Sequence, residues 1–285
     1  MKNDIIFKSS NGTEAKIILD SENPYNGIRL TTMQLRYPRF IHAELMTHRV
    51  FSRNASSSRA IPVEKMIKQV IEEPATPIHW GANQPGMQAD IELSEPLKDK
   101  AILLWKSAAL RAASVAQEMH NLGLHKQVAN RILEPFQFIS VVLTATEWDN
   151  WFALRSHPDA QPEIRDLSDR MADCLGISQA IPREYHLPYV SDEEIASEGV
   201  ETCFKLSTAR CARVSYLTHD GQTPDIQKDI ALYERLVGSV PIHASPTEHP
   251  AMGVLHTNFI KNFRGWYQHR CAVENTVENT VENAR

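Results

Sequence analysis

The sequence has few cysteines, no long apolar run and no excess of positive charge. Its four cysteines are spread over 285 residues without a CxxC pair, which argues against a disulfide scaffold, a structural zinc site and a dithiol redox centre. No stretch approaches the roughly 18 consecutive apolar residues of a membrane-spanning helix, and the polar start is not that of a signal peptide. Lys+Arg is 30 and Asp+Glu is 35, a balance that argues against non-specific nucleic-acid binding. We therefore expect a cytoplasmic protein that binds neither membranes nor nucleic acid.

Strand and helix periodicities alternate along the chain without a clean βαβ repeat. Alternation over 4–40 predicts short strands, including one at 28–37 that ends at Pro38, and the β-branched run 138–146 predicts a buried strand. Helical spacing is found at 40–49, 63–72, 97–122, 125–134, 147–155, 162–175 and between Thr223–Pro224 and Gly238. The sequence therefore predicts an α+β fold, with a mixed, largely antiparallel sheet and packed helices, in a single domain over 1–272.

Several segments carry more specific expectations. Much of the apolar face of the longest helix should come from Leu103, Leu104, Leu110, Ala113 and Val115. The hydroxyl-rich stretch 50–62 is expected to be a loop. The irregular stretch 73–96 holds four prolines and belongs to an insertion at 64–96, and its length makes it a candidate lid. The repetitive tail 273–285 is of low complexity, and we assign it no chemistry.

The sharpest anomaly in charge lies between residues 36 and 59. This stretch holds one acid, Glu44, no lysine, and five arginines: Arg36, Arg39, Arg49, Arg53 and Arg59. Arginine without lysine suggests bidentate recognition of phosphate or carboxylate, and short hydroxyl donors lie between the arginines. From composition alone, a solvated turn whose arginines pair with surface acids is the favoured interpretation, and an anion site is the alternative.

Other candidate sites are weaker. HASPTEH at 243–249 does not have a standard zinc spacing, so a capped turn entering a helix, with a stacked or hydrogen-bonding His249, is favoured over a metal site. Arg131 and Arg155 lie on predicted helices, and an arginine at a helix end is usually a simple dipole partner. Cysteine catalysis is not favoured either, because no partner histidine can be assigned to any of the cysteines.

Taken together, these segments resemble the flavin-dependent thymidylate synthases, the ThyX family. The family signature is RHRxxSxNxxSxR, and the chain reads THRVFSRNASSSR at 47–59. The matching positions are His48, Arg49, Ser52, Asn54, Ser57 and Arg59. A second family region is matched by Arg131 and ALRSHPDAQPEIR at 153–165. A third is matched by ARVSY at 212–216 and by HASPTEH, but it follows the signature here and precedes it in typical members. The chain therefore resembles a circularly permuted member.

The resemblance implies a reaction and its cofactors. In that family FAD lies between the subunits of a homotetramer, and NADPH reduces it. The enzyme transfers a one-carbon unit from 5,10-methylenetetrahydrofolate to C5 of dUMP, giving dTMP. Carried over by position, the residues near FAD or folate are His48, Arg49, Asn54, Asn150 and His249. Those at the nucleotide are Glu44, Ser57, Ser58, Arg59 and Arg131. Arg155 would be catalytic, stabilising negative charge on the pyrimidine.

The chain also departs from the family pattern. Thr47 replaces the leading arginine of the signature, and Thr144 and Thr146 occupy an Asn-x-Arg pair near FAD. Further departures are Glu44 for a frequent Gln, Ala55 for Glu and Ala60 for Tyr. They keep three alternatives open beside thymidylate synthesis: a hydroxymethylase of pyrimidine deoxynucleotides, a non-catalytic nucleotide-binding homologue and, more distantly, a metal-dependent hydrolase.

Overall fold

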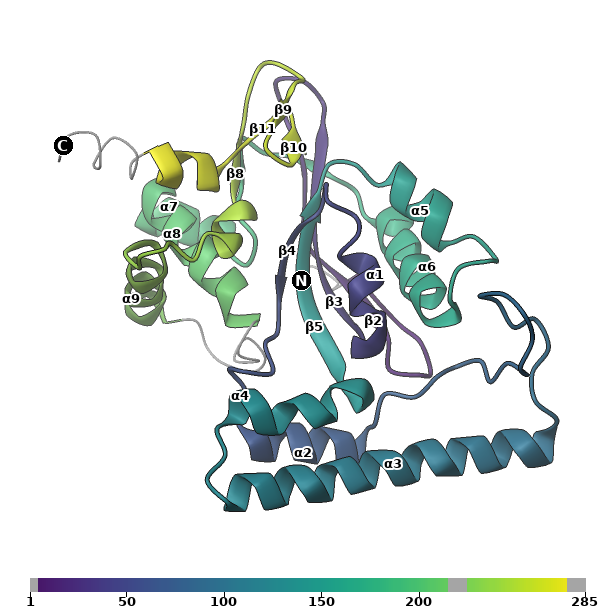
Figure 1. Ribbon diagram of the computed structural model, residues 1–285. Helices are drawn as coiled ribbons and strands as arrows, with labels where there is room; N and C mark the ends of the chain where they lie inside the picture. The colour runs from purple at the N-terminus through teal and green to yellow at the C-terminus, as the bar shows by residue number, and fades with distance from the viewer. Residues whose placement is uncertain (1–4, 215–224, 276–285) are drawn as a thin grey trace.

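The computed structural model describes residues 5–214 and 225–275 and is built around one twisted sheet (Figure 1). Its strands are β1 (Ile6–Lys8), β2 (Glu14–Glu22), β3 (Arg29–Pro38), β5 (Phe138–Ala145) and β4 (Ser52–Ala55), antiparallel in that spatial order. A short strand, β6 (Ile181–Pro182), pairs parallel with β2. The predicted α+β class, with a mixed and largely antiparallel sheet, is confirmed.

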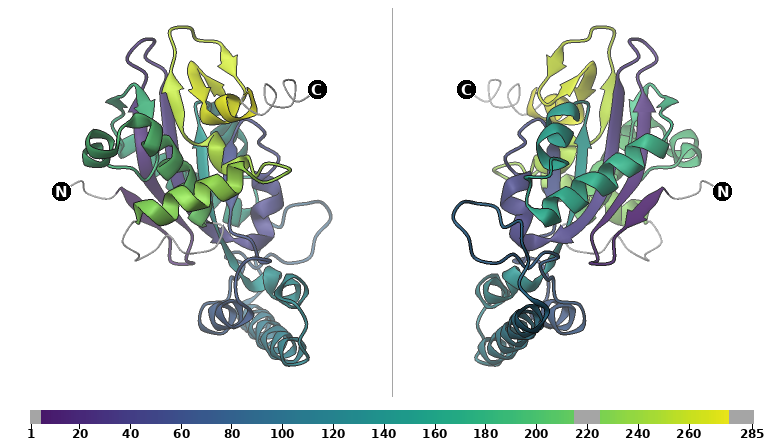
Figure 2. Two further views of the ribbon diagram at one scale, coloured as in Figure 1. Left: turned by 90° about the vertical axis from the view of Figure 1, so that its left-hand side faces the viewer. Right: turned by 90° about the vertical axis from the view of Figure 1, so that its right-hand side faces the viewer.

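Helices cover both faces of the sheet and one end of it (Figures 1 and 2). One face carries α1 (His42–Leu45), α5 (Asp149–Arg155) and α6 (Pro162–Ile177), and the other carries α7 (Asp192–Glu198), α8 (Val200–Arg213) and α9 (Ile226–Val237). The projecting end consists of α2 (Val63–Glu72), α3 (Glu95–Asn121), α4 (Lys126–Ala129) and the 3-10 helix η2 (Asn130–Phe136). These end helices bury an apolar cluster of their own.

Short elements complete the fold. They are the 3-10 helices η1 (Arg39–Ile41) and η4 (Ser245–Glu248), the small sheet β7 (Tyr185–His186), β8 (Ala251–Gly253) and β11 (Trp266–Gln268), and the hairpin β9 (Phe259–Ile260) and β10 (Phe263–Arg264). Residues 269–275 are helical. Among the described residues, no helix combines the length and the apolar character needed to cross a lipid bilayer.

The two faces of the central sheet differ because side chains alternate along each strand. Met33, Leu35, Val141 and Leu143 point into the main apolar core with α6. Their neighbours point the other way and include buried threonines at positions 32 and 144. An irregularity of the β2–β3 register between Ile17 and Leu19 shifts this alternation in β2.

Several local expectations need correction. The stretch 50–62 is not all loop, because β4 lies within it and pairs with β5 through buried Ser52 and Asn54. The helix predicted at 125–134 continues through Pro135 as η2. The helix α8 was not predicted.

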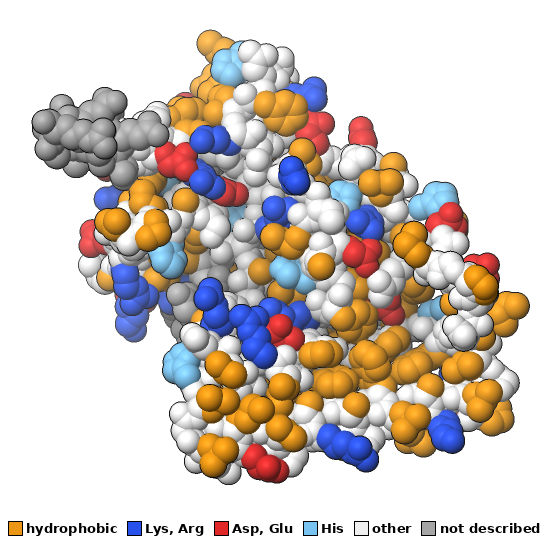
Figure 3. Space-filling model, in the orientation of Figure 1, with side chains coloured by type: hydrophobic (Ala, Val, Ile, Leu, Met, Phe, Trp, Pro, Cys, Tyr) orange, Lys and Arg blue, Asp and Glu red, His pale blue; other side chains and the backbone are white. Residues whose placement is uncertain are grey.

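The predicted apolar face of α3 is mostly exposed. Its leucines at 103, 104 and 110 are more than half exposed, whereas small residues, Ala109, Ala113 and Ala116, pack against α2 and η2. Figure 3 shows apolar side chains gathered over this end of the molecule. The leucine spacing was helical, but it did not identify which stripe faces the core.

The segment 73–96 is held in place by polar contacts. The backbone N–H of Ile78 donates to Glu163 at 2.9 Å, and that of Trp80 donates to Glu92 at 3.0 Å. Its role as a lid stays a prediction. The end of ARVSY at 215–216, the Thr223–Pro224 helix start and most of the tail, 276–285, lie outside the described residues.

Candidate functional site

The edge strand β4 divides the candidate site into two sides. The Asn54 amide donates to the carbonyl oxygen of Cys211 on α8 at 2.8 Å, while the Arg53 guanidinium donates to the carbonyl oxygen of His48 at 2.6 Å. Ser52 accepts from Gln268 at 2.9 Å. Polar side chains of the strand therefore reach both sides of the sheet edge.

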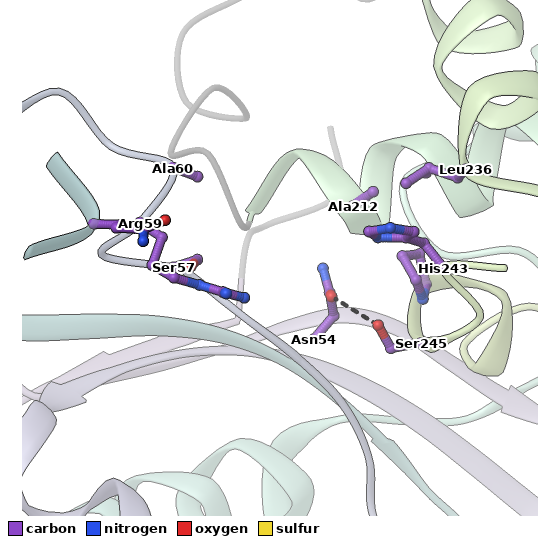
Figure 4. A pocket seen from close by; sticks show the side chains of 10 residues that line it. Asn54, Ser57, Arg59, Ala60, Ala212, Leu236, His243 and Ser245 are labelled. Atoms are coloured by element: carbon purple, nitrogen blue, oxygen red, sulfur yellow. Dashed lines mark hydrogen bonds between the residues drawn. The ribbon is translucent and has the colours of Figure 1, made fainter. Parts of the chain in front are cut away.

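A pocket of about 310 Å³ lies on the α8 side of β4 (Figure 4). It is lined by Asn54, Ser57, Arg59, Ala60, Gln127, Ala212, Leu236, His243, Ser245 and Pro246. Ser57 and Arg59 approach from the chain after β4, His243 approaches from the segment before η4, and Ser245 is the first residue of η4. The Ser245 hydroxyl points to Asn54 at 3.5 Å. Residues of the third matched region, Ala212, His243 and Ser245, thus line the same pocket as the signature residues Ser57 and Arg59.

The chemistry of this pocket suits an anionic ligand. Arg59 is exposed and forms no ion pair with a described residue. Serine, asparagine and histidine side chains supply further polar groups, and the remaining lining is apolar. One unpaired guanidinium beside hydroxyl donors can hold a phosphate, and the apolar part can hold a flat ring.

A second cluster is found around Arg155, at the end of α5. Its guanidinium pairs with Glu44 at 2.7 Å and donates from Nε to His48 Nε2 at 3.1 Å. His48 is buried and packs edge-on against Trp151. Burial, followed by the charges of Arg155 and Arg53, lowers the His48 pKa. A neutral His48 can therefore accept the hydrogen bond that Arg155 donates from Nε and so orient the guanidinium.

Three predicted nucleotide residues lie outside the pocket. Glu44 belongs to the Arg155 cluster. Ser58 donates to Glu134 at 2.6 Å, and Arg131 pairs with the same carboxylate at 2.9 Å. Arg39 also reaches Glu134, at 3.2 Å. The Glu134 carboxylate thus pairs with Arg39 and Arg131, two arginines that the sequence alone left as candidates for binding an anion.

His249 is fully buried behind η4. Its Nδ1 lies 2.8 Å from the Thr144 hydroxyl, and within the described residues its Nε2 has no hydrogen-bond partner. Burial lowers its pKa to about 3. The predicted hydrogen bond of His249 is confirmed, but the turn before it is not capped, because η4 begins without a side-chain cap and ends at Glu248. Two other predicted cofactor residues, Arg49 and Asn150, are exposed.

The arginines of 36–59 do not act as one group. Arg36 pairs with Glu73 at 2.6 Å, and its guanidinium carbon lies 3.8 Å from the centroid of the Phe138 ring. Arg39 and Arg53 are bound to Glu134 and to backbone carbonyl oxygens. Pairing with an acid thus holds for Arg36 and Arg39, whereas Arg53 is held by backbone carbonyl oxygens. The anion interpretation remains for Arg59.

Cysteine and metal chemistry find no support in the described residues. All four cysteines are buried and reduced, and burial raises the pKa of each thiol, to about 11 for Cys174. In the described part of the chain, no three His, Cys, Asp or Glu side chains gather as a metal site would require.

Sequence reasoning missed two buried residues next to His249. Thr32 bonds to Thr144 at 2.7 Å and to His186 at 2.8 Å. Thr32 shares its face of β3 with Leu30 but also with the polar Gln34 and Arg36, so the alternation along the strand gave no signal for its burial. Nothing in the pattern around His186 identified it.

Comparison with known proteins gives one family match. A family model described as thymidylate synthase complementing protein matches residues 29–182, more than half of the chain. This range contains the signature and the second family region and leaves the third outside. No curated protein matches the chain.

Two solved structures show a partial likeness. Both are of a UMP/dUMP methylase, PolB from Streptomyces cacaoi. The one bound with 5-Br dUMP has 18% identity and a TM-score of 0.44, covering 52% of this chain and 67% of that chain. The one bound with 5-Br UMP has 20% identity and a TM-score of 0.43, covering 54% and 70%.

Proposed function

The chain belongs to the thymidylate synthase complementing protein family, and from that premise we propose that it is a flavin-dependent thymidylate synthase. Its substrates would be dUMP and 5,10-methylenetetrahydrofolate, with NADPH as reductant and FAD as cofactor. The observation that carries the proposal is the pocket beside β4, where two signature residues, Ser57 and Arg59, face polar side chains of the third family region.

The nucleotide would bind in this pocket. Arg59 and Ser57 supply charge and a hydroxyl donor for the phosphate, and Asn54 is held in place by its bond to the Cys211 carbonyl oxygen. The apolar lining from Ala212 and Leu236 offers a surface for the sugar or the ring. A paired arginine would lose part of its attraction for phosphate, so the lack of a described acidic partner favours Arg59 for this task.

Arg155 would act at the pyrimidine. Glu44 and His48 fix two different nitrogens of its guanidinium, so the charge is oriented before substrate arrives. A preorganised cation stabilises negative charge that develops on the ring without reorganising solvent.

The residues present fit a flavin at the sheet edge. His249 offers a buried Nε2 that lacks a described partner, and His48 is a neutral imidazole beside exposed Arg49. When bound, reduced FAD would supply the hydride, which removes the need for a cysteine nucleophile. The helix α5, which ends at Arg155, and α8, which lines the pocket through Ala212, cover opposite faces of the sheet. A second copy of the chain in a homotetramer would bring one cluster near the other's pocket.

An absorption spectrum of the purified protein with added FAD and dUMP tests the proposal. We expect a flavin band that shifts when dUMP is added, because both ligands would share one site. With methylenetetrahydrofolate and NADPH present, mass analysis should then show dTMP. A product that retains one extra oxygen would instead identify a hydroxymethylase. Binding of dUMP without any flavin binding would overturn the enzyme proposal and leave a nucleotide-binding homologue.

A further inference from the structure

Five buried side chains form one continuous hydrogen-bond chain on the polar face of the sheet. Ser21 Oγ lies 2.8 Å from His186 Nδ1, and His186 Nε2 lies 2.8 Å from Thr32 Oγ1. Thr32 Oγ1 is 2.7 Å from Thr144 Oγ1, which is 2.8 Å from His249 Nδ1. All five residues are fully buried. The chain thus joins strands β2, β3 and β5 to β7 and to the residue after η4.

Only two arrangements of the protons satisfy this chain. Each threonine hydroxyl has one proton and sits between two partners, so it donates to one and accepts from the other. Burial keeps both imidazoles neutral, because it lowers the pKa values of His186 and His249. If the chain runs from Ser21 toward His249, both histidines carry their proton on Nε2. If it runs the other way, both carry it on Nδ1.

The end of the chain decides between these arrangements. The Ser21 hydroxyl has no hydrogen-bond partner among the described residues other than His186. In the second arrangement the Ser21 hydroxyl proton would therefore be buried without an acceptor, and His249 Nε2 would be a buried acceptor without a donor. In the first, Ser21 donates to His186, and a single group stays unpaired, the N–H at His249 Nε2. Fewer unpaired buried groups make the first arrangement lower in free energy.

We propose that Ser21, His186, Thr32 and Thr144 act as positioning residues that hold His249 in its Nε2–H tautomer, so that His249 presents a neutral hydrogen-bond donor to a ligand. The ligand atom it fits is an uncharged or anionic acceptor, such as a carbonyl oxygen or a ring nitrogen without hydrogen. A ligand that offers an N–H at this point would leave two donors facing each other. Only the identity of that ligand as FAD or folate rests on the proposed function.

The tautomer can be read directly by NMR of the full chain labelled with ¹⁵N-histidine. Long-range ¹H–¹⁵N correlations distinguish the two neutral tautomers and the imidazolium, and His249→Asn and His186→Asn assign the signals. We expect both residues to show the Nε2–H form at neutral pH. An Nδ1–H form or an imidazolium at His249 would overturn the proposal without any variant.

Variants of neighbouring threonines test the chain itself. Thr32→Val removes the hydroxyl but keeps the shape, and we expect His249 to become a mixture of tautomers, while Thr32→Ser restores the single form. Thr31→Val is the matched control, because Thr31 is equally buried on β3 but bonds to Asp20 on the other face. It should leave His249 unchanged. An unchanged His249 in Thr32→Val, or a mixture in Thr31→Val, would contradict the proposal.

The ligand is tested separately with FAD as the probe. Adding FAD to the labelled wild-type protein should shift the His249 Nε2 signal and keep the tautomer. A fixed Nε2–H tautomer with no shift would count against FAD in the proposed function and would leave the tautomer inference standing. Loss of the Nε2–H form on binding would overturn the inference, because the ligand would then not be an acceptor.

Discussion

The two faces of the central sheet are built from the same strands but bury different kinds of side chain. On β3 and β5, Met33 and Leu143 enter the apolar core, while their neighbours Thr32 and Thr144 enter a hydrogen-bonded layer that is just as deeply buried. Apolar burial stabilises the fold by about 25 cal/mol per Å² and has no directional requirement. A buried hydroxyl gives nothing unless every partner is in place. The apolar face therefore depends on the volume that its side chains fill, whereas the polar face depends on where each hydrogen-bond partner lies.

The largest expected effect comes from the apolar face. Leu143→Ala should lower the free energy of unfolding by about 2–5 kcal/mol, because the leucine is fully buried and its removal leaves a cavity. Urea denaturation followed by circular dichroism measures this. Leu255→Ala, at an exposed leucine, should change stability by less than about 0.5 kcal/mol. Equal losses in the two variants would break the comparison.

Arg155 extends from the helices that cover the apolar face. Arg155→Ala should lower kcat by about 10²–10³-fold, because an oriented cation is lost at the reacting ring. Stability and dUMP affinity should change far less. Single-turnover kinetics with equilibrium binding separates these terms, and Arg165→Ala on α6 is the control. Wild-type turnover without Arg155 would remove its assigned role.

Arg59 belongs to the pocket on the polar side. Arg59→Ala should weaken dUMP binding by about 1.5–3 kcal/mol, the value of a charge-assisted contact. Titration calorimetry measures the affinity, with Arg111→Ala on α3 as a matched exposed arginine. The reverse pattern, in which Arg59 affects turnover and Arg155 affects affinity, would contradict the roles assigned to both arginines.

The last test distinguishes the two faces by the pH dependence of stability. The His249 pKa is lowered from 6.5 to about 3 in the folded protein, so the unfolded chain takes up a proton first as the pH falls. Stability is thus lost as the pH drops below about 6.5, by about 1.4 kcal/mol per pH unit. The plot of unfolding free energy against pH should be flatter in His249→Asn, with exposed His256→Asn as control. Parallel plots would show that His249 takes up a proton as readily in the folded protein as in the unfolded chain.

The sequence was most informative where periodicity and chemistry agreed. Three elements are found close to their predicted bounds: the strands at 28–37 and 138–146 and the helix at 162–175. Each has a clear pattern of apolar residues, which marks either one buried face or two buried faces. Ser57 and Arg59 share a pocket, as their places in the signature suggested. Local patterns determine such features, and no distant residue is needed to decide them.

The sequence was least informative where distant residues decide. The leucines of α3 look like a core stripe, yet alanines pack there, because the close approach of α2 and η2 leaves room only for small side chains. The polar residues of β4, among them Ser52 and Asn54, predict a loop. In the structure β5 pairs with this strand, and Gln268 donates a hydrogen bond to Ser52. The hydrogen-bond partners of Thr32 come from two other segments, β5 and β7, and no pattern within one strand can indicate them.

The contacts that build the pocket also set the order in which the chain can complete it during synthesis. Asn54 bonds to a residue 157 positions later, Ser245 reaches it from 191 positions away, and Gln268 reaches Ser52 from 216. At about 5–20 residues per second on the ribosome, the strands and α6 are made well before η4 and β11 exist. The growing protein can therefore fold its apolar face first. The polar face and the edge strand β4 stay exposed until the later segments have been made. A nascent chain stopped before residue 245 would have a core but no complete pocket.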